Sequence, residues 1–307
     1  MIARHSSDTA TCLAIPASAS RLLSGNRRRD LFLLMAACRD ASAIMARHTD
    51  RHTARNGLRR LRAALRDRET SDALARPFLD LHDRHGLRLD MADLLVVTLL
   101  RDLEDPVVET WNGLIRYCHG SGGAVAVMMY PVLGAGADTL LPFAIDFGIA
   151  CRLIDIARNV RADAEAGRIY LPAALFPRPL APQQLCAATP QTISVAHDAA
   201  CKLLKRAMVH FRSAESALPS LSARSQAALL LALRRNEALA DRMAGQSPEI
   251  WWRSPASSST IGRTWQDGKT LTGLAVDRCL HGTLSKPPQH VAALHRPLRG
   301  LPGVPRS

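Results

Sequence analysis

Residues 148–172, GIACRLIDIARNVRADAEAGRIYLP, decide the fold class and contain the principal candidate site. Asp155, Asn159 and Asp163 follow one another at intervals of four residues, which places all three on one face of a helix. Carboxylates on one helical face, followed by Arg168 and a Tyr-Leu-Pro stop, suit a site where a divalent metal bridges acidic side chains to a phosphorylated substrate. The alternative is a solvated helix face of mixed charge, which would be the better interpretation of the two aspartates alone.

Composition and periodicity predict an all-α chain. Alanine, leucine and arginine dominate the 307 residues, and all three favour helix. Nothing between residues 20 and 250 is typical of a linker, so one large domain is expected. Apolar residues recur with helical spacing in four segments, 31–38, 92–100, 143–156 and 227–233. Helix ends are expected at Gly57, Gly86, the turn at 134–136, Pro172 and Pro219.

The opening stretch resembles the second aspartate-rich motif of the squalene and phytoene synthase family, R-D-V-x-x-D-x-x-x-G-R-x-Y-L-P. The matching segments here are 158–160, 163–164 and 167–172. Upstream segments are similar to the family's T-W-x-x-L-x-R-Y-C and A-G-T-V-G-x-M-M patterns in order and spacing, and they include residues 110–118 and 123–129. Residues 21–23 and 38–39 resemble the family's entry segment and the C-R before its first aspartate-rich motif. The resemblance covers about residues 15–252.

This resemblance implies a single helical domain of the isoprenoid synthase type, built around a central apolar cavity, over residues 15–252. Residues 1–14 are expected to be a flexible N-terminus. Residues 253–307 change in composition to Ser, Pro, Gly and Arg, which predicts a basic, disordered C-terminal tail.

The activity that the resemblance implies is head-to-head condensation of two prenyl diphosphates, either farnesyl or geranylgeranyl diphosphate, with Mg²⁺ as cofactor. Participation of NADPH is left open. The implied catalytic residues are Asp155, Asp163 and Asn159, of which Asp155 and Asp163 would bind the metal. The implied substrate-binding residues are Arg39, Arg158, Arg168, Tyr170 and Asp102.

The first aspartate-rich motif departs from the family pattern. The family places D-D-x-x-D just after its C-R, where this chain has Ser42, Ala43 and Ala46. None of these side chains binds a metal as a carboxylate does. We therefore predict a prenyltransferase-like protein of isoprenoid biosynthesis whose activity is reduced or lost. The alternative is a non-catalytic partner that keeps the fold and binds prenyl diphosphate or acts as a scaffold.

The net charge of +13 raises the question of an anionic partner. Nucleic acid is excluded because no recognition motif is present and aromatic residues make up only 4% of the chain. Prenyl diphosphates suit the basic balance. The basic C-terminal tail has two interpretations. It is either a solvated segment or a segment that is attracted to an anionic membrane surface. Its basic residues are Arg253, Arg263, Lys269, Arg278, Lys286, Arg296, Arg299 and Arg306.

The cysteines indicate a cytoplasmic protein, peripheral at a membrane if the basic tail binds one. All seven are scattered without a C-x-x-C pair, which is typical of reduced, buried thiols. Residues 117–137 lack Asp, Glu, Lys and Arg and approach membrane-spanning length, but Pro131 and the glycines favour a buried helix. Gly120 to Gly123 predict either close helix packing or a turn. His48 and His52 lie at i, i+4 and are expected to form an exposed basic face, since no third metal ligand accompanies them.

Overall fold

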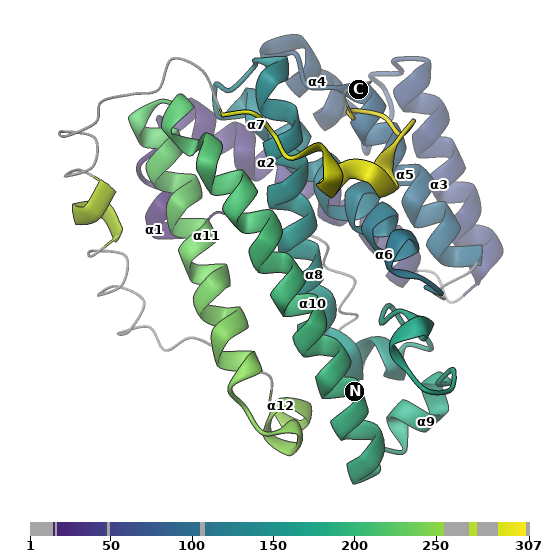
Figure 1. Cartoon of the computed structure of the whole chain (residues 1–307). Coiled ribbons are helices and arrows are strands. Elements are labelled where there is room, and N and C mark those ends of the chain that lie inside the picture. The colour runs from purple at the N-terminus through teal and green to yellow at the C-terminus, as the bar shows by residue number, and fades with distance from the viewer. Residues whose placement is uncertain are drawn as a thin grey trace.

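The chain folds into a bundle of helices (Figure 1). The structure is a computed structural model, and it describes residues 15, 17–47, 50–104, 108–254, 270–274 and 288–304. Within these ranges every regular element is a helix and no β-strand occurs, which confirms the all-α prediction. The predicted N-terminal segment 1–14 and His48 lie outside the described residues.

The α-helices have the following bounds: α1 Ala17–Ser20, α2 Gly25–Arg47, α3 Arg51–Arg66, α4 Arg76–His85, α5 Leu89–Glu104, α6 Trp111–Cys118, α7 Ala124–Val132, α8 Leu141–Glu165, α9 Pro182–Cys186, α10 Pro190–Ala217, α11 Ala223–Ala244 and α12 Pro248–Arg253. A π-helix, η1 (His119–Gly123), joins α6 to α7. The 3₁₀ segments are η2 Asp138–Leu140, η3 Ala173–Leu175, η4 Leu218–Ser220 and η5 Ala292–Leu298. Residues 270–274 form a further short helical turn.

Local sequence signals explain where several helices begin and end. Asp50 caps α3 because its carboxylate accepts hydrogen bonds from the backbone N–H groups of His52 and Thr53. Gly86 ends α4 with a φ of 68°, a left-handed conformation that glycine adopts without strain. The helix end expected at Gly57 was wrong, since α3 continues through it. A Cβ at Gly57 would lie 3.0 Å from Ile44, so this glycine instead allows α2 and α3 to approach closely.

The centre of the bundle is the pair α8 and α10, which pack on each other more extensively than any other two described helices (Figure 1). The helical run α6–η1–α7 crosses α8 at Gly122 and Gly148. A Cβ on Gly122 would lie 2.4 Å from the carbonyl oxygen of Gly148, so no larger residue fits without a backbone shift. The prediction of close helix packing at Gly120 to Gly123 is confirmed, and it places α6 directly beside the aspartate-bearing half of α8.

The helical part of the uncharged segment 117–137 lies in the protein interior. All residues of η1 are buried, as is nearly all of α7. Among the described residues, no helix is both long and apolar enough to cross a bilayer.

Part of the predicted C-terminal tail packs on the bundle. Residues 288–304 lie across α6 and the start of α8, drawn in yellow in Figure 1. Leu294 and Leu298 of η5 are buried, and Arg116 of α6 donates a hydrogen bond to the carbonyl oxygen of Pro297 at 2.6 Å. The Ser/Pro/Gly composition did not indicate this packing. The rest of the tail, except for 253–254 and 270–274, lies outside the described residues.

The described cysteines are free thiols. Cys38, Cys118 and Cys151 are buried as expected, whereas Cys186 is exposed. Burial raises the pKa of Cys38 and of Cys118 to about 12, so both thiols stay protonated and inert near neutral pH.

Candidate functional site

Helix α8 carries the predicted carboxylates into the protein interior. Asp155 is 1% exposed and Asp163 is 8% exposed, while Asn159 between them is half-buried. The solvated-face alternative is therefore wrong for both aspartates. Arg158 donates to Asp155 across one helical turn at 2.9 Å, so this carboxylate already has a cationic partner.

A buried arginine lies beside the two aspartates. Arg152 precedes Asp155 by three residues on the same helical face and is only 4% exposed. Its Nη2 donates to the hydroxyl of Tyr117 at 2.7 Å, and its guanidinium carbon lies 5.3 Å from the Tyr117 ring centroid and 5.6 Å from that of Tyr170. Burial by itself lowers the pKa of Arg152, but the surrounding phenol oxygens and carboxylates outweigh burial and raise it. A permanent cation thus occupies the carboxylate cluster.

Two stacked tyrosines connect this arginine to Asp102 of α5. The rings of Tyr117 and Tyr170 are 4.9 Å apart and nearly parallel, and the Tyr170 hydroxyl donates to Asp102 at 2.7 Å. Arg168 lies 3.7 Å from the same carboxylate. Burial raises the pKa of Asp102 above its ordinary value, although the Tyr170 hydrogen bond and the positive charge of Arg168 oppose the rise. The structure therefore brings together Asp102, Arg168 and Tyr170, three of the residues for which the resemblance implies substrate binding.

A cavity of about 510 Å³ opens next to this group. Asp102, Tyr117 and Tyr170 form one wall, and Arg101 and Arg116 contribute cationic side chains. Leu94, Val108 and Leu301 add apolar surface, the last from the C-terminal segment. The cavity has the mixed character expected for a ligand with a charged head and an apolar chain.

Helix α2 contributes little to this cluster. Ser42 is buried and donates its hydroxyl to the carbonyl oxygen of Cys38, a bond internal to the helix. Ala43 is half-buried, and Arg39 is exposed and does not line the cavity. The resemblance implied that Arg39 binds substrate. In the structure Arg39 is not among the residues that line this cavity.

The residues present do not fit the Mg²⁺ cluster that the resemblance implies. Mg²⁺ requires oxygen ligands in nearly ideal octahedral geometry, and a carboxylate-poor α2 supplies none from Ser42, Ala43 or Ala46. On α8, Arg158 pairs with Asp155, and Arg152 places positive charge next to both aspartates.

Comparison with known proteins gives the family. The sequence profile described as squalene/phytoene synthase matches residues 17–260. The chain belongs to the squalene/phytoene synthase family. Members of this family act in isoprenoid biosynthesis on prenyl diphosphates.

Squalene/phytoene synthase relatives match most of the chain. The 15-cis-phytoene synthase of Enterobacter agglomerans is 28% identical over 256 residues, which cover 79% of this chain and 86% of that protein. The 15-cis-phytoene synthase of a Paracoccus strain is 29% identical over 258 residues, 80% of this chain and 84% of that protein.

Solved structures of the squalene/phytoene synthase type share the fold. A dehydrosqualene synthase superposes with a TM-score of 0.66 at 19% identity and covers 90% of this chain and 98% of its own. A squalene synthase from Alicyclobacillus acidocaldarius gives a TM-score of 0.58 at 19% identity, over 77% of this chain and 92% of its own. At this identity the likeness concerns the fold alone.

Sequence reasoning missed Arg152 and the contact of Tyr117 with it. The spacing of Arg152 and Asp155 at i, i+3 was a signal that the two share a face. No local signal indicated that Tyr117 and Tyr170, 53 positions apart, would stack on that arginine.

Proposed function

We propose that this squalene/phytoene synthase family member binds a prenyl diphosphate and condenses it weakly or not at all. In this proposal the chain acts in isoprenoid biosynthesis as a binding protein, or as a slow enzyme. Farnesyl and geranylgeranyl diphosphate are the candidate ligands.

The buried guanidinium of Arg152 among the site's carboxylates carries this proposal. Departure of diphosphate from an allylic carbon requires strong electrostatic stabilisation of the leaving group. A fixed arginine that is already shared among two tyrosines and two aspartates supplies less of it than metal ions bound directly to the phosphate oxygens. The missing carboxylates at Ser42, Ala43 and Ala46 weaken ionisation further.

The cavity beside Asp102 supports binding. Arg101 and Arg116 line it together with Asp102 and Glu109, and Arg168 lies 3.7 Å from Asp102, so arginines outnumber carboxylates at this cavity. Arginine donors suit phosphate oxygens because they offer several N–H groups in a planar fork. The adjoining leucine and valine side chains suit the first isoprene units of the chain.

Binding and turnover are measured separately with the purified full-length protein. Equilibrium dialysis with farnesyl and with geranylgeranyl diphosphate, each with Mg²⁺, is expected to show binding. Extraction into organic solvent is expected to show little or no C30 or C40 product. If neither diphosphate binds, this proposal is excluded and the scaffold alternative is favoured.

Restoring the first motif tests the reason for low turnover. The triple variant Ser42→Asp, Ala43→Asp, Ala46→Asp is expected to release diphosphate in the presence of Mg²⁺ faster than the natural protein, because it regains carboxylates where the family has them. The matched control carries asparagine at the same three positions, with the same size and no charge. Equal rates for the two variants would contradict the electrostatic explanation.

Head-to-head condensation by the unmodified chain is the second candidate. Burial of Asp155 and Asp163 favours it, as does the match to 15-cis-phytoene synthases over about four-fifths of the chain. Robust Mg²⁺-dependent synthesis of a C30 or C40 product would establish this candidate and refute the first.

A further inference from the structure

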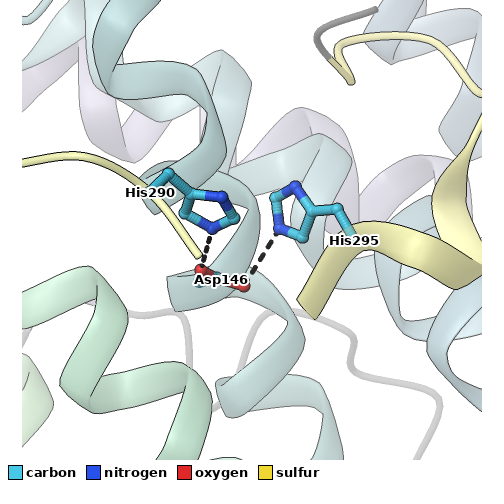
Figure 2. Close-up of side chains that lie close together, drawn as sticks. All are labelled: Asp146, His290 and His295. Atoms are coloured by element: carbon cyan, nitrogen blue, oxygen red, sulfur yellow. Dashed lines mark hydrogen bonds and ion pairs between the residues drawn. The ribbon is translucent and has the colours of Figure 1, made fainter. Parts of the chain in front are cut away.

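A second polar cluster surrounds Asp146, near the start of α8. Figure 2 shows His290 and His295 of the C-terminal segment pointing at this carboxylate from two sides. The Nε2 atom of His290 lies 2.8 Å from one carboxylate oxygen, and the Nε2 atom of His295 lies 3.0 Å from the other. His210 of α10 contacts Asp146 through Nδ1 at 2.7 Å, and Ser213 donates its hydroxyl at 2.5 Å.

The carboxylate of Asp146 is fully buried and needs positive charge nearby. Its exposed fraction is 0%. Among the described residues, no lysine or arginine forms an ion pair with it. Buried carboxylates in proteins are paired with cations, hydrogen-bonded or bound to metals.

The ligand atoms have the spacing of a metal site. One carboxylate oxygen of Asp146 and one ring nitrogen from each of His290 and His295 all lie within 4.8 Å of one another. Neighbouring ligands around a tetrahedral zinc ion lie about 3.3 Å apart, which follows from bonds of about 2.0 Å. The two nitrogen–oxygen distances, 2.8 Å to one carboxylate oxygen and 3.0 Å to the other, are a few tenths of an ångström shorter than this spacing, so the two imidazoles would have to shift slightly outward to admit an ion.

Supporting contacts for such a site are already in place. His210 and Ser213 come from α10 and hold the carboxylate by hydrogen bonds, as outer partners of a metal-bound carboxylate do. The ring of Phe143 packs edge-on against His290 at 5.3 Å between centroids and fixes its orientation. His290 keeps 12% of its side chain exposed, which provides a route for an ion to enter.

We propose that Asp146, His290 and His295 bind a divalent transition-metal ion that fastens the C-terminal segment to α8. Two imidazole nitrogens and one carboxylate oxygen suit Zn²⁺, with a fourth position for water. Mg²⁺ and Ca²⁺ do not suit this site because they prefer oxygen ligands only.

This site is separate from the prenyl diphosphate site and does not depend on it. Asp146 and Asp155 are nine positions apart on α8, about 13 Å along the helix axis. The two proposals can therefore fail independently.

Zinc titration of the metal-stripped full-length protein, followed by calorimetry, is the direct test. We expect one equivalent of Zn²⁺ to bind and Mg²⁺ to produce no heat of binding. The variants Asp146→Asn and His290→Gln keep side-chain volume and are expected to lower zinc affinity by at least about 100-fold, a loss larger than that from removing an outer partner. The matched control is His52→Gln, which removes an exposed imidazole of α3 and should leave binding unchanged.

Two further measurements distinguish a metal site from a hydrogen-bonded clasp, in which His290 and His295 only form hydrogen bonds to Asp146. Ser213→Ala removes only an outer partner and should lower zinc affinity by about 10- to 100-fold. Zinc should also slow tryptic cleavage after Arg299, which lies just beyond η5, in the natural protein but not in His290→Gln.

Helical circular dichroism confirms that each variant is folded before its affinity is interpreted. Failure of the folded natural protein to bind one equivalent of zinc would overturn the proposal and leave a hydrogen-bonded clasp. Zinc binding that His52→Gln abolishes and His290→Gln retains would overturn it as well, by assigning the metal to α3.

Discussion

At the scale of single residues, the site is defined by which charges are buried together. Arg152 differs from the other arginines of α8 because it lies among two tyrosine rings and two aspartates and is almost fully enclosed. Arg161 lies on an exposed face of α8 and forms an ion pair with Glu165 at 2.9 Å. Exposed pairs contribute little to stability, whereas removing one member of a buried cluster leaves the others uncompensated.

Replacement of Arg152 by methionine is therefore expected to be strongly destabilising. We expect urea unfolding to show a loss of about 3 to 5 kcal/mol, because Asp155 and Asp163 stay buried with less positive charge. Arg161→Met, at an exposed pair on the same helix, should change the free energy of unfolding by less than about 1 kcal/mol. Equal losses for the two variants would show that Arg152 is not electrostatically coupled to the aspartates.

At the scale of helices, two features position the elements around the site. One is close packing at glycines, and the other is a group of charged side chains around Asp30, which we call the Asp30 clamp. Gly148 of α8 faces Gly122 of η1, and a Cβ on Gly148 would lie 2.3 Å from the carbonyl oxygen of Gly122. Asp30 of α2 is buried and accepts hydrogen bonds from Arg84 and from His85, the latter at 2.7 Å, which ties α2 to α4.

A methyl group at the helix crossing should disturb the bundle. Gly148→Ala is expected to lower the free energy of unfolding by about 1 to 3 kcal/mol, since the backbones must separate to admit it. Gly245→Ala is the control, because the nearest atom to its Cβ would be at an ordinary 3.4 Å. Thermal unfolding of both variants measures the difference, and unchanged stability of Gly148→Ala would contradict the packing argument.

The clamp at Asp30 makes stability depend on pH in a defined direction. Burial raises the pKa of this carboxyl, but hydrogen bonds from His85 and Arg84 outweigh burial and lower it below the ordinary value. A carboxyl with a lowered folded-state pKa stabilises the protein above its unfolded-state pKa of about 3.9, and the contribution disappears as pH falls through the folded-state value.

We expect Asp30→Asn to cost about 1 to 3 kcal/mol at pH 7, the usual contribution of hydrogen bonds to a charged group. The difference from the natural protein should shrink as the pH falls below about 4. Urea unfolding across this pH range measures it. A difference that stays constant with pH would show that the charge of Asp30 is not involved.

At the scale of the whole molecule, the C-terminal segment is part of the folded unit. Residues 288–304 bury Leu294 and Leu298, contact α6, and supply two of the groups that satisfy Asp146. Leu301 of the same segment lines the cavity beside Asp102. Composition alone predicted a disordered tail beyond Arg253, whereas residues 288–304 pack on the bundle through these contacts.

Deletion of residues 288–307 is expected to lower the free energy of unfolding by at least about 3 kcal/mol, from the exposure of two buried leucines and their neighbours. It should also weaken prenyl diphosphate binding, since Leu301 no longer closes the cavity. A chain that ends at Val304 is the control. Chemical denaturation of both chains checks the expectation, and equal stability would show that the segment adds nothing to the folded state.

The helical class, the family and the position of Asp155 and Asp163 on one helix face could all be predicted from the sequence. These follow from spacing along one helix and from an extended motif, and both are properties of neighbouring residues. Asp146 was also visible, as a lone charge in the apolar run LPFAIDFGIAC, but its partners were not.

Only the tertiary structure decided which distant groups meet those residues. His290 and His295 reach Asp146 from 144 and 149 positions away, and Tyr117 and Tyr170 enclose Arg152 from two separate segments. Such contacts depend on how the helices cross and where the chain returns, which is set by the packing of the whole core. Local periodicity carries no information about that return, so a tail of Ser, Pro and Gly gave no sign that it would pack on the bundle.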